Sequence, residues 1–335
     1  MIINKINSLL QMPIKTIPIL KPKIWGGRRL LSFGKSALSN GKIGESWEIS
    51  TRKDESNIIV NNVFAGKTLR EIVRRYPEEI LGKKLASRGI TEIPLLVKFL
   101  DVSDRLSVQV HPDNISAKRF GEPEGSKMEA WYILDRKPDS FILLGCKKDL
   151  TKSSFLNKLK SKPDSCWTLL KSDKRRFFLI PPGTLHSSGG GLTIFEVSEN
   201  CDITYRVYDW DRKEGKERKC SIDKAVATIF RKDGRQKYTG LGKCLPARNS
   251  RKNRIVSSGK FSIEEIILNR SSYRFTLQTF AVLTVVSGQV QIKCSDKETE
   301  VLVGETVLLP AVLKKVEILS GLSSTMIVVK PGANI

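Results

Sequence analysis

Short apolar runs dominate the chain between residues 43 and 198. These runs are rich in β-branched and aromatic residues, and Gly, Pro, Asn and Asp punctuate them. Runs of about four to eight such residues between turn-forming residues predict β-strands rather than helices. The predicted strands have the sequences IGESWEIS, SNIIVN, LLVKFLD, LSVQV, EAWYIL, SFILLGC, RRFFLIP and LTIFEVS.

Helical spacing is confined to insertions near residues 66–90, 149–162 and 221–232, where apolar residues recur three and four positions apart. Ser221 is suited to cap the last insertion. A polar, basic stretch at 236–260 predicts a loop or linker. Strand-like alternation then returns and continues to the end of the chain, as in AVLTVVSGQVQI and TEVLVGETVLLP.

This order of elements predicts a mainly β protein, a sandwich or barrel with short helical insertions, followed by a second β-domain. Residues 1–250 are expected to form a catalytic domain that contains the helical insertions. Residues 251–335 are expected to form a second, smaller β-domain. No histidine occurs after His186, so this second domain is predicted to be free of metal.

The composition favours a stable intracellular protein without disulfides. With 335 residues, of which 40% are hydrophobic, the chain can bury a sizeable core. Six cysteines lie far apart without a C-x-x-C pair, which indicates reduced thiols rather than a disulfide framework. The N-terminal stretch has no signal-peptide pattern, and no run of about eighteen apolar residues occurs. We therefore expect a soluble cytoplasmic protein that does not enter a membrane.

The formal net charge of +23 raises the question of a nucleic-acid partner. Basic residues, however, occur in small groups mixed with acids, as in SDKRR and DRKEGKERK, and no recognition motif accompanies them. We expect a solvated basic surface and no nucleic-acid partner. Such a surface would steer a phosphorylated small molecule toward the protein.

The two histidines of the chain both lie in motifs that suit metal binding. Strand alternation places Ser107, Gln109 and His111 on one side of LSVQVHP, and a Pro-Pro-Gly turn precedes His186, a spacing similar to the second metal motif of cupin barrels. Glu129 lies in the strand between the two motifs. A barrel could therefore bring Gln109, His111, Glu129 and His186 together.

Such a set of nitrogen and oxygen donors suits a divalent metal with open positions for water or substrate. Zinc is the first choice, and non-haem iron is compatible with the same donors. A lone histidine on a strand is more often a packed side chain than a ligand. Here both histidines fall in motifs shaped by glycine or proline, and an acid lies between them, so a metal site is the better interpretation.

Several motifs along the chain together indicate a specific protein family. In order along the chain they are KIWGG, GESWEIS, LLVKFLDVSDRLSVQVHPD, SKMEAWYIL, PPGTLHS and DITYRVYDWDR. In this order and spacing they resemble type I mannose-6-phosphate isomerases of the short bacterial branch, from about Pro18 to the end of the chain. The resemblance implies tandem cupin barrels and a zinc-dependent interconversion of mannose 6-phosphate and fructose 6-phosphate, with one zinc per chain.

The resemblance also implies roles for single residues. The zinc ligands of the family fall on Gln109, His111, Glu129 and His186. The remaining matched positions are, as catalytic residues, Lys127, Glu196 and Arg206 and, as substrate-binding residues, Lys98, Ser107 and Asp202.

The chemistry needs such groups, because moving a proton between C1 and C2 of an open-chain sugar passes through an enediolate. Glu196, Lys127 or a metal-bound water could carry the proton, and the sequence does not rank them. Arg206 and Lys98 offer positive charge to a phosphate or to vicinal oxygens.

Two other functions are compatible with the same motifs: an iron-dependent cupin oxygenase, and a sugar-binding cupin without catalytic activity. Oxygen consumption would favour the first, and metal binding without turnover the second. The presence of Lys127, Glu196 and Arg206 speaks against a protein that has lost catalysis. We expect a monomer or weak homodimer that acts on a sugar phosphate.

Overall fold

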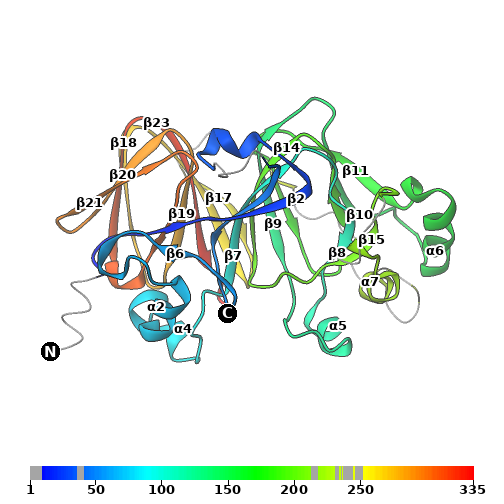
Figure 1. Ribbon diagram of the computed structural model, residues 1–335, viewed down its shortest axis with the longest axis horizontal. Coiled ribbons are helices and arrows are strands. Elements are labelled where there is room, and N and C mark those ends of the chain that lie inside the picture. Colours follow the sequence, from blue (N-terminus) through cyan, green and yellow to red (C-terminus); the bar gives the residue numbers. More distant parts are fainter. Residues whose placement is uncertain are drawn as a thin grey trace. The chain divides into compact units, whose positions relative to one another are not determined.

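The computed structural model describes residues 10–35, 41–212, 218–230, 234, 236, 244–245 and 252–335 (Figure 1). The chain forms two compact units. Unit 1 comprises Met1–Lys21, Arg29–Phe99 and Ala247–Ile335. Unit 2 comprises Pro22–Arg28 and Leu100–Pro246. The mainly β class with short helical insertions is confirmed.

Unit 1 is built on a nine-stranded sheet. Its main path runs β17 (Lys252–Ser257), β18 (Phe261–Thr276), β23 (Lys315–Pro331), β19 (Ala281–Ser287), β22 (Thr306–Leu309), β1 (Ile14–Ile17) and β6 (Ile58–Ile59). Off this path, β20 (Gln289–Cys294) pairs with β23 and with β21 (Lys297–Leu302). A separate two-stranded sheet joins β4 (Thr51–Arg52) and β5 (Glu55–Ser56).

Alternation along these strands forms the core of unit 1. On β20, Val290 and Ile292 are buried while the residues between them are more exposed, as a two-residue repeat requires. They join Val301 and Ile318 in one hydrophobic cluster. Burying each such side chain contributes about 1.5–3 kcal/mol relative to leaving it in water.

Unit 2 contains a five-stranded sheet and most of a seven-stranded one. The five-stranded order is β11 (Trp167–Lys171), β10 (Phe141–Cys146), β13 (His186–Ser188), β8 (Val108–Val110) and β15 (Tyr205–Tyr208). The seven-stranded order is β16 (Cys244–Leu245), β12 (Phe177–Ile180), β9 (Glu129–Arg136), β14 (Leu192–Glu199), β7 (Leu95–Val102), β3 (Ile43–Ile49) and β2 (Ile19–Gly27). The unit boundary falls within β2 and β7.

The two sheets of unit 2 share one hydrophobic core. Ile142 and Leu144 of β10 lie in the same buried cluster as Trp131 and Ile133 of β9 and Phe178 of β12. Residues two apart on a strand point to the same side. Polar residues at the ends of these strands can therefore meet where the inner faces of the two sheets approach each other.

Helices occupy the three predicted insertions. They are α2 (Leu69–Arg75), α3 (Pro77–Leu81), α4 (Lys83–Ala86), α6 (Lys152–Ser161) and α7 (Ile222–Ile229). Outside the insertions lie the 3-10 turns η1 (Arg29–Phe33), η2 (Asn62–Phe64), η3 (Pro163–Ser165) and η5 (Ala311–Leu313). Thr68 and Glu71 form a reciprocal capping box at the start of α2. Ser221 is the N-cap of α7, but its side chain makes no capping hydrogen bond. None of the described helices is long and apolar enough to cross a membrane.

The structure differs from the sequence-based expectation in two places. The loop predicted at 236–260 is wrong for β16 and β17, because β17 pairs with β18 over its length; residues 237–243 and 246–251 lie outside the described part. Residues 29–99 group with the C-terminal strands, since β1 pairs with both β22 and β6. The assignment of a catalytic domain to residues 1–250 stays a prediction.

Candidate active site

Three predicted site residues form a row across the five-stranded sheet. His186 on β13 lies opposite Gln109 on β8, and Gln109 lies opposite Arg206 on β15. Directly opposed residues of antiparallel strands project to the same face. The amide nitrogen of Gln109 lies 3.3 Å from Nε2 of His186. Register therefore places these three side chains on one face.

The seven-stranded sheet supplies the acids. Glu129 opens β9, and Glu196 lies on the neighbouring strand β14, opposite Trp131. Because Trp131 is two residues after Glu129, all three side chains face the same side of the sheet. Glu129 and Glu196 are both buried.

His111 follows directly after β8 and is held in place by a backbone contact with a distant part of the chain. Its carbonyl accepts a hydrogen bond from the backbone N–H of Gly183, in the turn before His186. The next element is α5 (Asn114–Arg119), a helix that the hydrophobic pattern does not predict, with Asp113 as a side-chain N-cap. These contacts tie the two histidine motifs together.

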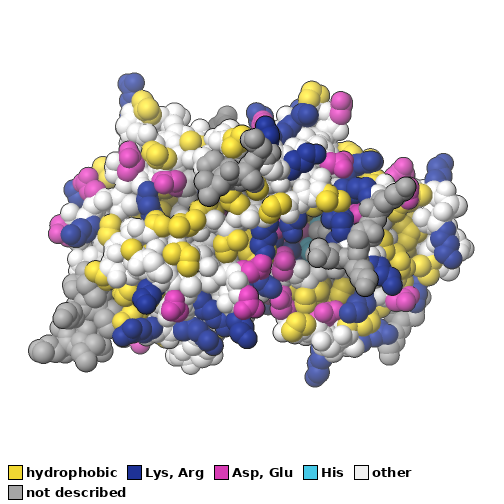
Figure 2. Space-filling view, viewed as in Figure 1, with side chains coloured by type: hydrophobic (Ala, Val, Ile, Leu, Met, Phe, Trp, Pro, Cys, Tyr) yellow, Lys and Arg dark blue, Asp and Glu magenta, His cyan; other side chains and the backbone are white. Residues whose placement is uncertain are grey.

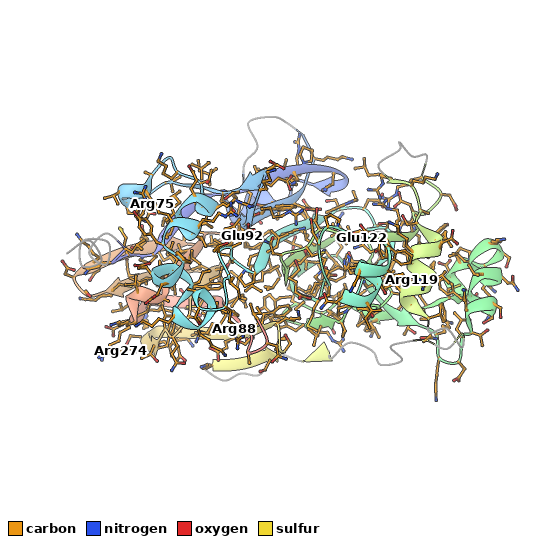
Figure 3. The ribbon with its side chains drawn as sticks, turned by 90° about the horizontal axis from the view of Figure 1, so that it is seen from below. Arg75, Arg88, Glu92, Arg119, Glu122 and Arg274 are labelled. Atoms are coloured by element: carbon orange, nitrogen blue, oxygen red, sulfur yellow. The ribbon has the colours of Figure 1, made fainter. Side chains whose placement is uncertain are left out.

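The segment between His111 and Lys127 is also anchored to the rest of unit 2. Arg119 ends α5 and Glu122 follows it (Figure 3). The Glu122 carboxylate accepts hydrogen bonds from the Tyr205 hydroxyl at 3.0 Å and from Lys224 Nζ at 2.7 Å. Tyr205 lies on β15 and Lys224 on α7, so this segment is attached to two elements of the unit.

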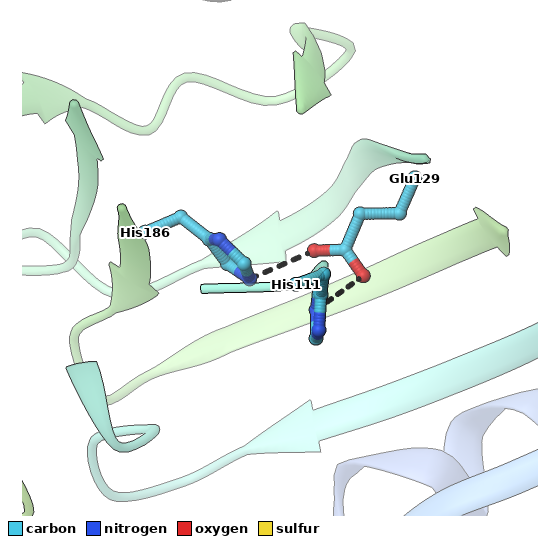
Figure 4. A group of neighbouring side chains, drawn as sticks. All are labelled: His111, Glu129 and His186. Carbon is cyan, nitrogen blue, oxygen red and sulfur yellow. Dashed lines mark ion pairs between the residues drawn. The ribbon is translucent and has the colours of Figure 1, made fainter. Parts of the chain in front are cut away.

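One donor atom each from His111, Glu129 and His186 lies within 4.8 Å of the others (Figure 4). Nε2 of His111 is 3.2 Å from one carboxylate oxygen of Glu129, and Nε2 of His186 is 3.0 Å from the other. All three residues are buried. Unit 2 thus brings together three of the four predicted ligands through their donor atoms.

Hydrogen bonds fix which nitrogen of each ring carries the proton. Nδ1 of His111 lies 2.8 Å from the carbonyl oxygen of Ile203, and Nδ1 of His186 lies 2.9 Å from that of Thr184. A carbonyl oxygen only accepts, so each Nδ1 must carry the hydrogen. In a neutral ring, Nε2 then presents a lone pair to the carboxylate.

The resulting arrangement fits a bound cation. Each lone pair on a histidine Nε2 faces a carboxylate oxygen, which is also an acceptor. Nε2 of His111 and both oxygens of Glu129 are buried without a contact of hydrogen-bond geometry. Buried polar atoms are rarely left this way unless another group satisfies them. Two imidazoles and a carboxylate form a donor set that zinc and similar divalent metals prefer.

The charge state of the cluster also suits metal binding. Burial and the nearby Lys127 charge lower the pKa of His111 to about 4, so the ring is neutral at pH 7. Burial opposes ionisation of Glu129, but Lys127 and the two histidines outweigh it and hold the pKa of Glu129 well below its usual value. Metal ligands must be deprotonated, and both residues are.

We expect the metal-free protein to lose stability as the pH falls from 6.5 to 4. Unfolding restores the ordinary pKa of His111, near 6.5, so between these values the unfolded state binds a proton that the folded state does not. The free energy of unfolding then falls with falling pH, by at most about 1.4 kcal/mol per pH unit for this one proton. Urea titrations of chelator-treated protein at several pH values measure it. In the variant His111→Gln, the free energy of unfolding should depend less steeply on pH. Equal slopes for the two proteins would contradict the lowered pKa of His111 in the folded state.

Lys127 links the cluster of His111, Glu129 and His186 to Glu196. Its Nζ lies 3.2 Å from Oε2 of Glu129 and 4.0 Å from Oε1 of Glu196. All three side chains are buried. Two carboxylates on either side of one ammonium group form a short path along which a proton can be held or moved.

The other predicted residues make local contacts within their own units. The buried Ser107 hydroxyl donates to Oε1 of Gln109 at 3.1 Å, so it is one step from the row of β13, β8 and β15. Asp202 is exposed, and its backbone N–H donates to Glu124. Lys98 belongs to unit 1, where its Nζ lies 3.4 Å from Glu45.

Sequence patterns did not predict several contacts of the site. The carbonyls of Ile203 and Thr184 leave no trace in residue identity, because every residue has a carbonyl. Glu199 accepts from Ser126 Oγ and the Met128 N–H, both at 2.9 Å, and so anchors the start of β9. Trp131 could have been predicted to face the site, since it lies two positions after Glu129 on the same strand.

Comparison with known proteins places the chain in a family. Residues 14–142 match the family model "Phosphomannose isomerase type I, catalytic domain". The Bacillus subtilis (strain 168) protein named "Probable mannose-6-phosphate isomerase GmuF" is 33% identical over 305 residues, which cover 89% of this chain and 93% of that protein. A mannose-6-phosphate isomerase of Streptococcus mutans is 29% identical, with 87% and 90% of the two chains covered.

The fold gives the same result. The crystal structure of the mannose 6-phosphate isomerase from Bacillus subtilis superposes with a TM-score of 0.83 and 30% sequence identity. The match covers 95% of this chain and 99% of that one. This likeness confirms the predicted fold class of tandem cupin-type barrels with short helical insertions. From the matched motifs, the identity over nearly the whole chain and the shared fold, we conclude that the chain belongs to the type I phosphomannose isomerase family.

Proposed function

We propose that this protein is a metal-dependent aldose–ketose isomerase that interconverts mannose 6-phosphate and fructose 6-phosphate. The observation that carries the proposal is the buried cluster of His111, Glu129 and His186, whose donor atoms converge within 4.8 Å. Membership of the type I phosphomannose isomerase family supports the choice of reaction.

We propose one zinc ion per chain, held by His111, Glu129 and His186, with Gln109 as a fourth ligand. When bound, a divalent metal stabilises negative charge on the sugar oxygens during proton transfer. The amide of Gln109 lies beside the cluster with its nitrogen toward His186, so it would bind metal only after turning its oxygen inward. Gln109 is therefore the proposed ligand with the weakest support.

Proton transfer, charge stabilisation and substrate binding are assigned to other predicted residues. Glu196 and Lys127 are proposed to move the proton between C1 and C2, supported by their burial and their contact at 4.0 Å. Arg206 is proposed to stabilise charge on the reacting oxygens, from the strand that lies next to Gln109. Ser107, Asp202 and Lys98 are proposed to bind the substrate.

The surface is compatible with a sugar phosphate as the only partner. Basic and acidic side chains are mixed over the visible face rather than segregated (Figure 2). The net charge of +23 favours approach of a small anion. We propose a cytoplasmic enzyme, monomeric or weakly dimeric, that binds neither nucleic acid nor membrane.

Both alternative functions could use the cluster of His111, Glu129 and His186, but they differ in the residues that they need around it. An iron-dependent oxygenase needs two histidines and one carboxylate with open positions, which the cluster also offers. A sugar-binding protein without catalysis would have no need for a buried lysine between two buried carboxylates. The arrangement of Lys127, Glu129 and Glu196 therefore favours the isomerase.

The direct test is formation of fructose 6-phosphate from mannose 6-phosphate, followed in a coupled assay. We expect turnover by the metal-loaded protein, loss of more than about 95% of it after chelation, and recovery when zinc is added back, because metal loss removes the group that stabilises the charge. Oxygen consumption with added iron but no fructose 6-phosphate would instead support the oxygenase. Metal binding with neither reaction would support the sugar-binding protein.

A further inference from the structure

Trp131 contacts two residues of the active site at once. Its indole N–H donates a hydrogen bond to Oε2 of Glu196 at 3.0 Å. Its ring packs edge-on against the ring of His186, with centroids 5.4 Å apart and planes at 77°. The side chain is fully buried. A single aromatic side chain thus touches both a proposed metal ligand and a proposed catalytic acid.

The strand register produces both contacts. Trp131 on β9 lies directly opposite Glu196 on β14, and it lies two residues after Glu129. Opposed residues share a face of the sheet, as do residues two apart on one strand. Since β9 and β14 pair along most of their length, neither side chain can turn away without breaking the ladder.

The hydrogen bond limits how the Glu196 carboxylate can lie. Oε2 receives the indole N–H, while Oε1 lies 4.0 Å from Nζ of Lys127, whose other carboxylate neighbour is Glu129. Indole N–H is only a donor, so this contact keeps its direction whatever the protonation state of the neighbours. The carboxylate is thereby turned with Oε1 toward Lys127.

Packing alone does not require this group. Trp131 belongs to a hydrophobic cluster that includes Ile133 and Phe178, where a phenyl ring would supply apolar contact as well. Burying an indole N–H costs free energy unless the N–H finds a partner. A tryptophan at this position therefore brings in a polar group that the core does not need but that Glu196 uses.

We propose that Trp131 is a positioning residue for the isomerase reaction: it orients Glu196 for proton transfer and does not itself touch the reacting atoms. This inference rests on the proposed function. It predicts that loss of the indole N–H impairs turnover through Glu196 alone and leaves metal binding unchanged.

The first test is the variant Trp131→Phe in the metal-loaded enzyme. We expect kcat to fall about ten- to a hundredfold, the effect of losing one hydrogen bond to a charged group, with KM changed less than about threefold and full metal content. Trp167→Phe is the matched control, because Trp167 is also buried but packs against Tyr208 and Trp210. It should lower thermal stability by a comparable amount and leave kcat unchanged.

A double-mutant cycle separates positioning from packing. If Trp131 acts through Glu196, then Trp131→Phe made in a Glu196→Gln background should lower kcat further by less than about threefold. An equal fold-loss in both backgrounds, or an unchanged kcat in the single variant, would overturn the proposal.

A spectroscopic measurement keeps the inference testable even if Trp131→Phe fails to fold. In ¹⁵N-labelled protein, the indole N–H resonance of Trp131 should move when Glu196 is replaced by alanine, since its acceptor is lost. An unmoved resonance would overturn the hydrogen bond and the proposal with it. This readout needs no activity, so it is distinct from failure of the proposed function, which would be a wild-type protein without isomerase turnover.

Discussion

Replacing His186 with alanine is expected to remove metal and activity together. His186 is one of three residues whose donor atoms converge, and its Nε2 lies 3.0 Å from Glu129. Loss of a partner behind a metal ligand already costs about 10- to 100-fold in metal affinity, so loss of the ligand itself should cost more than about 100-fold. Metal content after dialysis and kcat/KM in the coupled assay should fall in parallel.

The neighbouring serine provides the control for His186→Ala. Ser187 is also fully buried on β13, but its hydroxyl donates to the carbonyl of Leu106 and, as the next residue on the strand, it points to the opposite face. Ser187→Ala should retain metal and turnover, with stability as its only loss. Normal zinc content in His186→Ala would contradict the ligand assignment.

Replacing Arg206 with alanine is expected to lower kcat/KM by about 100- to 1,000-fold while metal content stays normal. Arg206 lies opposite Gln109, on the same face as His186, and so borders the cluster without belonging to its donor set. Removing a group that stabilises developing negative charge typically costs a factor of this size in kcat. Steady-state kinetics together with metal analysis measure both quantities.

Two variants sharpen the interpretation of Arg206→Ala. Arg206→Lys keeps the positive charge but loses the planar pair of donors, so we expect it to recover only part of the activity. Arg119→Ala removes the same charge from an exposed position at the end of α5 and should leave kcat/KM within about twofold. If Arg206→Ala behaved like Arg119→Ala, Arg206 would have no part in the reaction.

The strands of the protein could be predicted well because short runs of apolar, β-branched and aromatic residues are a local property of the chain. Predicted runs such as LLVKFLD and EAWYIL coincide with β7 and β9. A run of this kind, however, shows that a strand forms and not which strand lies beside it. The pairing of β1 with β22, nearly 300 residues away, leaves no local trace, and for that reason unit 1 combines both ends of the chain.

The long strand β18 illustrates a second limit of prediction from sequence. The sequence predicts separate strand-like runs at FSIEEIILN and RFTLQTFAVLTVVSG, whereas one strand runs through Phe261–Thr276 and the next begins at Ala281. A polar stretch in the middle of β18 interrupts the alternation, and the ladder shifts register between Asn269 and Ser271. A bulge of this kind continues a strand through residues that would otherwise end it.

The convergence of His111, Glu129 and His186 could be predicted, but the contacts around them only in part. Both histidines lie in motifs shaped by glycine or proline, and an acid lies on the strand between them. These features are readable in the sequence and indicate a shared ligand. The carbonyls that orient the rings, and the indole that holds Glu196, depend on which elements pack together. The tautomers, and the geometry that Trp131 imposes, therefore become visible only in the folded protein.

The central claim is that His111, Glu129 and His186 hold one divalent metal at the isomerase site. Anomalous diffraction from crystals of the zinc-loaded protein, collected on both sides of the zinc absorption edge, tests it most directly. We predict a single strong peak in contact with both histidine Nε2 atoms and the Glu129 carboxylate. An active, zinc-loaded enzyme with no peak there, or with its zinc bound by other residues, would contradict the account.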